Sequence, residues 1–130
     1  MRSFLLLIAL LVASTVGAQQ LQSPSEFLGY ELGSKFTRHH EVLSYYRYVS
    51  ETLPGQVQLE SYGYTNERRP LMTAFLSTEK NMDALERLRQ EHLKSTEGTG
   101  EAELAIVWLS YNVHGNESVS TEASMQTLYE

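Results

Sequence analysis

The chain of 130 residues contains no cysteine. This absence excludes a disulfide scaffold, a cysteine-ligated zinc finger, an iron–sulfur cluster and a cysteine nucleophile. Any metal ion must therefore be held by histidine and carboxylate side chains. Basic residues are also few, since 10 Lys and Arg stand against 16 Asp and Glu, for a net charge of −6. This balance argues against a nucleic-acid partner, because Lys and Arg must neutralise the phosphates of a bound nucleic acid.

The composition is that of a folded, acidic protein. Hydrophobic residues make up 42% of the chain and charged residues 20%, which is too apolar for a disordered sequence. The length accounts for one ordinary domain at most. Composition therefore limits the class of protein but indicates no chemistry.

Residues 1–18 have the pattern of a secretory signal peptide. Arg2 gives a positive start, Phe4–Ala13 is an unbroken apolar run, and Val16–Ala18 supplies the small residues of a cleavage site. The apolar stretch from Phe4 to Val16 has 13 residues, whereas a membrane-spanning helix needs about 20. Removing 18 of the 130 residues leaves a mature chain of 112. We expect this chain to be secreted or periplasmic, with no membrane span after cleavage.

The first part of the mature chain predicts a lead-in, a helix and a hairpin. Residues 19–35 are mostly polar and are predicted to be extended. Apolar residues at helical spacing predict a helix over Arg38–Leu53, with Thr37 as its cap. Strands Val57–Tyr64 and Pro70–Ser77, joined by the turn Thr65–Arg68, are predicted to form a β-hairpin.

The second part predicts two helices around a buried strand. Asn81 is expected to cap a helix over Met82–Leu93. The run Leu104–Leu109 is apolar at every position, as in a strand covered on both faces in the middle of a sheet. A last helix starts near Ser118–Ser120. The order of elements predicts an α/β fold, a three-layer α/β/α domain with a mixed sheet.

The end of the sequence suggests a larger domain. The last helical pattern runs to Tyr129 and Glu130 without a glycine, a proline or a polar tail. The buried strand also needs more neighbours than the two predicted strands can provide. We therefore expect a truncated fold, in which residues 36–130 are the N-terminal portion of a catalytic domain. We expect the isolated 112-residue piece to fold poorly and to be inactive.

One short motif carries candidate metal chemistry. His114 and Glu117 are separated by three positions and follow the predicted buried strand directly. Imidazole and carboxylate are both good zinc ligands, and sites in open α/β sheets form beyond the carboxyl ends of strands. Gly115 would allow a sharp turn, and Ser118 or Ser120 would cap the following helix. We expect His114 and Glu117 to bind Zn²⁺; the alternative is a polar loop with a capping glutamate.

The sequence around this motif resembles the zinc carboxypeptidase family of carboxypeptidase A. Residues 106–117 read IVWLSYNVHGNE, which is similar to the family's buried strand followed by His-x-x-Glu and a helix. The upstream segments Leu53–Gly55 and Tyr62–Leu71 also look like the family, and Phe36–His40 looks like its secreted bacterial members. The resemblance covers about Gly29 to Glu130.

The resemblance implies a carboxypeptidase-like fold (phosphorylase/hydrolase-like) and hydrolysis of peptide or protein substrates by zinc-activated water. It makes His114 and Glu117 the first two zinc ligands. The family's third ligand, its general-base Glu and its substrate-binding Arg and Tyr lie far downstream of this motif and match no position here. Asn116 stands where the digestive members have Arg, so their specificity is not carried over.

Two other functions remain open. The first is an aspartoacylase-like zinc deacylase, which uses the same four residues but reaches them near its start, without the long lead-in found here. The second is a non-catalytic secreted binding module or inactive homologue, in which His114 and Glu117 are structural.

Other polar and aromatic residues have simpler interpretations. His39 and His40 at a helix start and His92 on the second helix are predicted to be surface or capping residues. The Arg68-Arg69 pair is predicted to lie in an exposed turn. Helical spacing predicts that Tyr45 and Tyr46, which could also line a groove, pack at the edge of the core.

Overall fold

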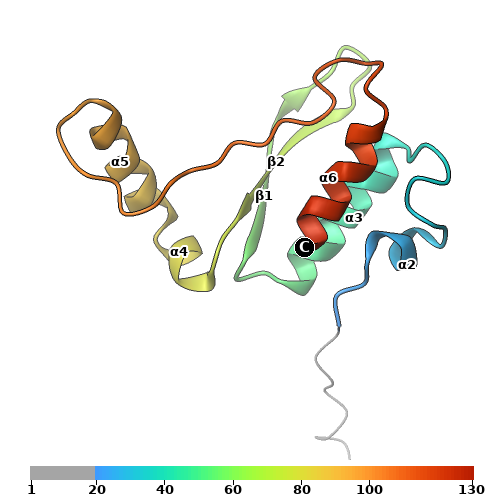
Figure 1. Ribbon diagram of the computed structural model, residues 1–130, viewed down its shortest axis with the longest axis horizontal. Helices are drawn as coiled ribbons and strands as arrows, with labels where there is room; N and C mark the ends of the chain where they lie inside the picture. Colours follow the sequence, from blue (N-terminus) through green and yellow to red (C-terminus); the bar gives the residue numbers. More distant parts are fainter. Residues whose placement is uncertain (1–19) are drawn as a thin grey trace, which may run out of the picture.

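The computed structural model describes residues 20–130, so the predicted signal peptide lies outside the described residues. The helices and strands, in chain order, are α2 (Pro24–Leu28), α3 (His39–Thr52), β1 (Val57–Tyr64), β2 (Pro70–Leu76), α4 (Glu79–Asp83), α5 (Leu85–Thr96) and α6 (Val119–Tyr129). Figure 1 shows α6 lying beside α3, with the hairpin on one side and α2 on the other. Within residues 20–130, no helix is long and apolar enough to span a bilayer.

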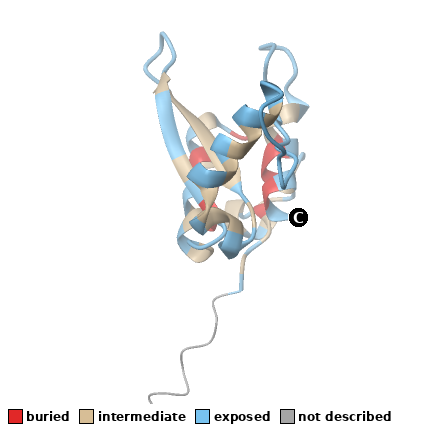
Figure 2. Cartoon of the chain, turned by 90° about the vertical axis from the view of Figure 1, so that its left-hand side faces the viewer, coloured by how far each residue is buried: buried red, intermediate tan, exposed pale blue. Residues whose placement is uncertain are grey.

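The core lies between α3, α6 and the start of β1. Tyr45 and Val49 are one helical turn apart on α3 and are fully buried, because residues four apart share a helix face. Met125 of α6 and Val57 of β1 pack against them. Figure 2 shows the buried positions gathered along these elements. The predicted packing role of Tyr45 is confirmed.

The hairpin is confirmed in detail. β1 and β2 are antiparallel, with Val57 opposite Leu76 and Tyr64 opposite Pro70. A bulge between Ser61 and Gly63 shifts the register, and Gly63 has a φ of +152°, which favours glycine. The closing turn is held by a hydrogen bond that the backbone N–H of Thr65 donates to the carbonyl of Arg69, at 2.9 Å.

The lead-in differs from the predicted extended chain, because it contains the short helix α2. The Ser23 hydroxyl accepts a hydrogen bond from the Glu26 N–H, and the Glu26 carboxylate accepts one from the Ser23 N–H at 2.8 Å. This capping box, with Pro24 at the first helical position, was readable in the sequence. Phe27 then stacks on Tyr48 with a centroid distance of 5.0 Å, which ties α2 to α3.

Two predicted helix starts are wrong. Thr37 does not cap α3; Arg38 occupies the N-cap position, and its backbone N–H donates to the Glu41 carboxylate at 2.8 Å. The predicted helix over Met82–Leu93 is instead α4 and α5, which meet at Ala84, where φ is −106° and ψ is 15°. Thr78 caps α4, because its side-chain oxygen accepts a hydrogen bond from the Asn81 N–H.

The predicted strand Leu104–Leu109 is also wrong. The segment has no regular secondary structure and every one of its residues is exposed, with Val107 at 77%. A strand that is apolar on both faces is stable only when neighbours pair with its edges and helices cover its faces. The sheet within residues 20–130 contains β1 and β2 alone, so neither condition is met there. The described residues thus form an α/β arrangement with a two-stranded antiparallel sheet, and the three-layer order stays a prediction.

Candidate metal site

His114 and Glu117 come together on the loop that precedes α6. The Nδ1 atom of His114 lies 2.8 Å from Oε1 of Glu117. The other carboxylate oxygen, Oε2, accepts a hydrogen bond from the backbone N–H of His114 at 3.3 Å. The predicted pairing of an imidazole with a carboxylate is therefore present in the geometry.

A tight turn produces this convergence. The backbone N–H of Glu117 donates to the carbonyl of His114 at 3.1 Å, and the N–H of Ser120 donates to the carbonyl of Glu117 at 3.2 Å. Gly115 is not required for the turn: its φ lies outside the left-handed region and a Cβ there would meet no atom within 4 Å. Ser118 occupies the N-cap position of α6, but its side chain makes no capping hydrogen bond.

The residue in the left-handed conformation is Asn112, with a φ of +54°. Its amide Nδ2 donates to the Thr121 hydroxyl at 3.0 Å, and that hydroxyl lies 3.3 Å from Asn112 Oδ1. Thr121 belongs to the first turn of α6, so this contact closes the loop that carries His114 and Glu117. The sequence reasoning missed the contact, although asparagine is among the few residues that tolerate a positive φ.

The site is open to solvent. The side chain of His114 is 70% exposed and that of Glu117 is 46% exposed. Zinc binds imidazole nitrogen and carboxylate oxygen at about 2.0–2.2 Å, so two donor atoms 2.8 Å apart can reach one ion. The chemistry of this donor pair fits zinc, and the 2.8 Å separation is that of a hydrogen bond between the two side chains. Within residues 20–130, however, no cluster of three or more His, Asp or Glu side chains could hold a metal ion.

The other histidines lie elsewhere. His39 and His40 begin α3, and His92 lies on α5. His39 is half-buried, and this burial lowers its pKa below the ordinary value, with a further contribution from the positive charge of Arg69. A cation beside an imidazole disfavours a second cation, so the geometry does not favour a metal at His39.

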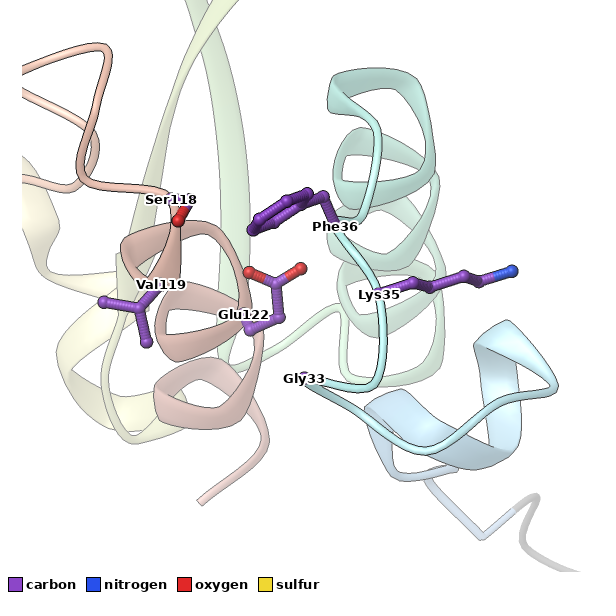
Figure 3. Close-up of a pocket in the computed structure, with 6 residues that line it drawn as sticks. All are labelled: Gly33, Lys35, Phe36, Ser118, Val119 and Glu122. Carbon is purple, nitrogen blue, oxygen red and sulfur yellow. The ribbon is translucent and has the colours of Figure 1, made fainter.

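A shallow cavity of about 130 Å³ lies at the N-terminus of α6. Its lining residues are Gly33, Lys35, Phe36, Ser118, Val119 and Glu122, drawn in Figure 3. The Glu122 carboxylate lies on the cavity side of α6, whereas the Lys35 side chain points away (Figure 3). Neither His114 nor Glu117 lines this cavity. The candidate metal pair therefore lies on an exposed loop outside it.

The comparison with family models identifies the chain. The model of the zinc carboxypeptidase family matches residues 42–130, which is more than half of the sequence and includes the His114–Glu117 loop. The chain therefore belongs to the zinc carboxypeptidase family. The comparisons with curated proteins and with solved structures found no match.

Proposed function

We propose that the protein is a secreted zinc metallocarboxypeptidase and that His114 and Glu117 are two of the zinc ligands. The observation that carries the proposal is the approach of His114 Nδ1 to Glu117 Oε1, at 2.8 Å, on an exposed loop within the family match. When bound, zinc would polarise the scissile carbonyl and lower the pKa of a coordinated water.

The two side chains have complementary tasks in this site. His114 would offer the neutral Nδ1 as a ligand, which requires the ring proton to reside on Nε2. Glu117 would contribute a negative charge, and the hydrogen bond from the His114 backbone N–H to Oε2 leaves Oε1 to face the ring. The proton that joins Nδ1 and Oε1 in the metal-free pair would have to leave before both atoms could bind a metal ion.

A catalytic zinc site usually has three protein ligands and one open position. The proposal therefore requires a third donor that residues 20–130 do not place beside the pair. It also requires a general base and groups that bind the substrate's terminal carboxylate. Peptide or protein substrates are proposed from the family, and the exposure of the His114 side chain leaves room for a chain to approach. Secretion is proposed from the pattern of residues 1–18.

The proposal is tested on the protein expressed from its complete reading frame, by elemental analysis and by release of C-terminal residues from peptides. We expect stoichiometric zinc and peptide hydrolysis, both of which His114→Ala and Glu117→Gln remove. His40→Ala is the matched control, because His40 is an exposed histidine at the start of α3.

The outcomes separate the alternatives. Stoichiometric zinc with hydrolysis of N-acyl amino acids, but not of peptides, would indicate the deacylase chemistry instead. A protein without zinc, in which His114→Ala changes no activity, would be a binding module or an inactive homologue. The match to the zinc carboxypeptidase model supports the peptidase over the deacylase.

A further inference from the structure

We propose that Asn112 and Thr121 are positioning residues for the His114–Glu117 pair. Their side chains form a clasp across the loop, and we call this contact the Asn112–Thr121 clasp. It consists of the Nδ2 to Oγ1 hydrogen bond at 3.0 Å and the Oγ1 to Oδ1 hydrogen bond at 3.3 Å. The inference rests on the proposed function, because it concerns how the same two ligands are held.

The clasp connects an exposed loop to a fixed part of the fold. Thr121 lies in the first turn of α6, and the same helix is anchored in the core by Met125, which is fully buried. Glu122, the next residue, accepts a buried hydrogen bond from the Thr37 N–H at 2.8 Å. Thr121 is therefore a fixed point, and Asn112 ties the beginning of the loop to it.

The conformation of Asn112 supports this role. Its φ of +54° is costly for most residues, and asparagine and glycine tolerate it best. Glycine would suit the backbone but lacks the amide that reaches Thr121. Asparagine meets both demands, since its side chain is short, polar and able to donate and accept.

Few other contacts fix the side chains of His114 and Glu117. Among residues 20–130, the hydrogen bonds to the His114 and Glu117 side chains all run within the pair. Both side chains are exposed, so packing does not fix them. The relative position of the two donors therefore depends on the loop backbone, and the clasp limits the shapes that this backbone can adopt. Outer partners that orient metal ligands typically change metal affinity by about 10–100-fold.

The test uses the protein expressed from its complete reading frame, purified free of metal and titrated with Co²⁺ alone, whose visible absorption reports its coordination. Asn112→Gly keeps the backbone conformation and removes the amide, whereas Thr121→Val removes the hydroxyl at nearly constant volume. Each should weaken Co²⁺ binding about tenfold. The double variant should be little weaker than either single variant, because the two groups act as one unit.

Two controls separate positioning from general damage. Thr121→Ser keeps the hydroxyl and should restore the affinity of Thr121→Val. Thr127→Val makes the same substitution at an exposed position of α6 and should leave Co²⁺ binding unchanged. Thermal denaturation should show no matching loss of stability in Asn112→Gly or Thr121→Val. Hydrogen exchange of the Glu117 amide, which bonds to the His114 carbonyl, should be faster in both variants without any metal.

The outcomes distinguish the two proposals. The proposed role of the Asn112–Thr121 clasp is overturned if His114→Ala abolishes Co²⁺ binding while Asn112→Gly and Thr121→Val bind Co²⁺ as tightly as the unaltered protein. Unchanged exchange at Glu117 in both variants would overturn it as well. If His114→Ala binds Co²⁺ as well as the unaltered protein does, the proposed function fails and the clasp loses its role with it.

Discussion

The Glu122 carboxylate accepts a hydrogen bond from the backbone N–H of Thr37 at 2.8 Å, across 85 positions of the sequence. Both residues are 7% exposed. Thr37 precedes α3 and Glu122 lies in the first turn of α6, so this bond joins the start of one helix to the start of the other. It explains why Thr37 is buried although it does not cap α3.

Glu122→Ala should destabilise the protein, because it leaves the buried Thr37 N–H without its acceptor. The expected loss is about 1–3 kcal/mol in the free energy of unfolding, measured by urea denaturation. Glu122→Gln keeps an acceptor oxygen and should lose less. Glu51→Ala, at an exposed position of α3, is the control and should have little effect. Equal stability of Glu122→Ala and Glu51→Ala would show that the buried bond contributes nothing.

The lowered pKa of His39 predicts that the folded protein loses stability at mildly acidic pH. Burial, reinforced by the charge of Arg69, lowers the pKa of His39 in the folded protein below its ordinary value of 6.5. Between the two pKa values the unfolded chain binds more protons, so the free energy of unfolding rises with pH. This contribution is therefore complete above about pH 6.5 and is lost as the pH falls below it.

The check for His39 is urea denaturation over the range from neutral to mildly acidic pH. His39→Gln should flatten the pH dependence of the unfolding free energy in this interval. Thr127→Val, at an exposed position of α6 that carries no titratable group, is the control and should keep the slope of the unaltered protein. If His39→Gln keeps the same slope, titration of His39 is not linked to folding.

Arg68 occupies an unfavourable backbone conformation in the hairpin turn. Its φ is +61°, in the left-handed region that glycine adopts without strain. Arg68→Gly should stabilise the protein by up to about 1 kcal/mol, because relief of strain exceeds the added flexibility of the unfolded chain. Arg69→Gly lacks this gain and also removes the exposed Arg69–Glu67 ion pair at 2.7 Å. Thermal denaturation of both variants checks the prediction, which fails if Arg68→Gly is the less stable of the two.

Trp108 is the single tryptophan of the chain and is 73% exposed. The fluorescence of the 130-residue chain should therefore have the red-shifted maximum of a hydrated indole, and acrylamide should quench it readily. Trp108→Tyr provides the blank for this measurement. A blue-shifted, poorly quenched emission would show that the segment Leu104–Leu109 is covered, as the sequence pattern predicts for a buried strand.

Local patterns in the sequence predicted much of the fold. The helical spacing of Tyr45 and Val49 placed one face of α3 in the core, because a periodicity of 3.6 residues needs only local information. The alternating strands and the turn before Arg69 fixed the hairpin for the same reason. The prediction of a strand over Leu104–Leu109 is wrong because the conformation of this run depends on what pairs with it and covers it, which no local pattern specifies.

The candidate site was likewise predictable from the sequence only in part. The spacing of His114 and Glu117 identified the donor pair, because both residue types are good zinc ligands and lie three positions apart. The sequence did not indicate that Asn112 takes a positive φ to reach Thr121, nor that Gly115 has no such need.

The sequence by itself determined which chemistry is available: no thiol ligands, a His and a Glu within one short motif, and an acidic chain. Only the tertiary structure decided how these groups are held. The Thr37–Glu122 hydrogen bond joins residues 85 positions apart. Contacts over such distances arise only after α3 and α6 pack on a shared core, and packing is a property of the whole chain and not of any local segment.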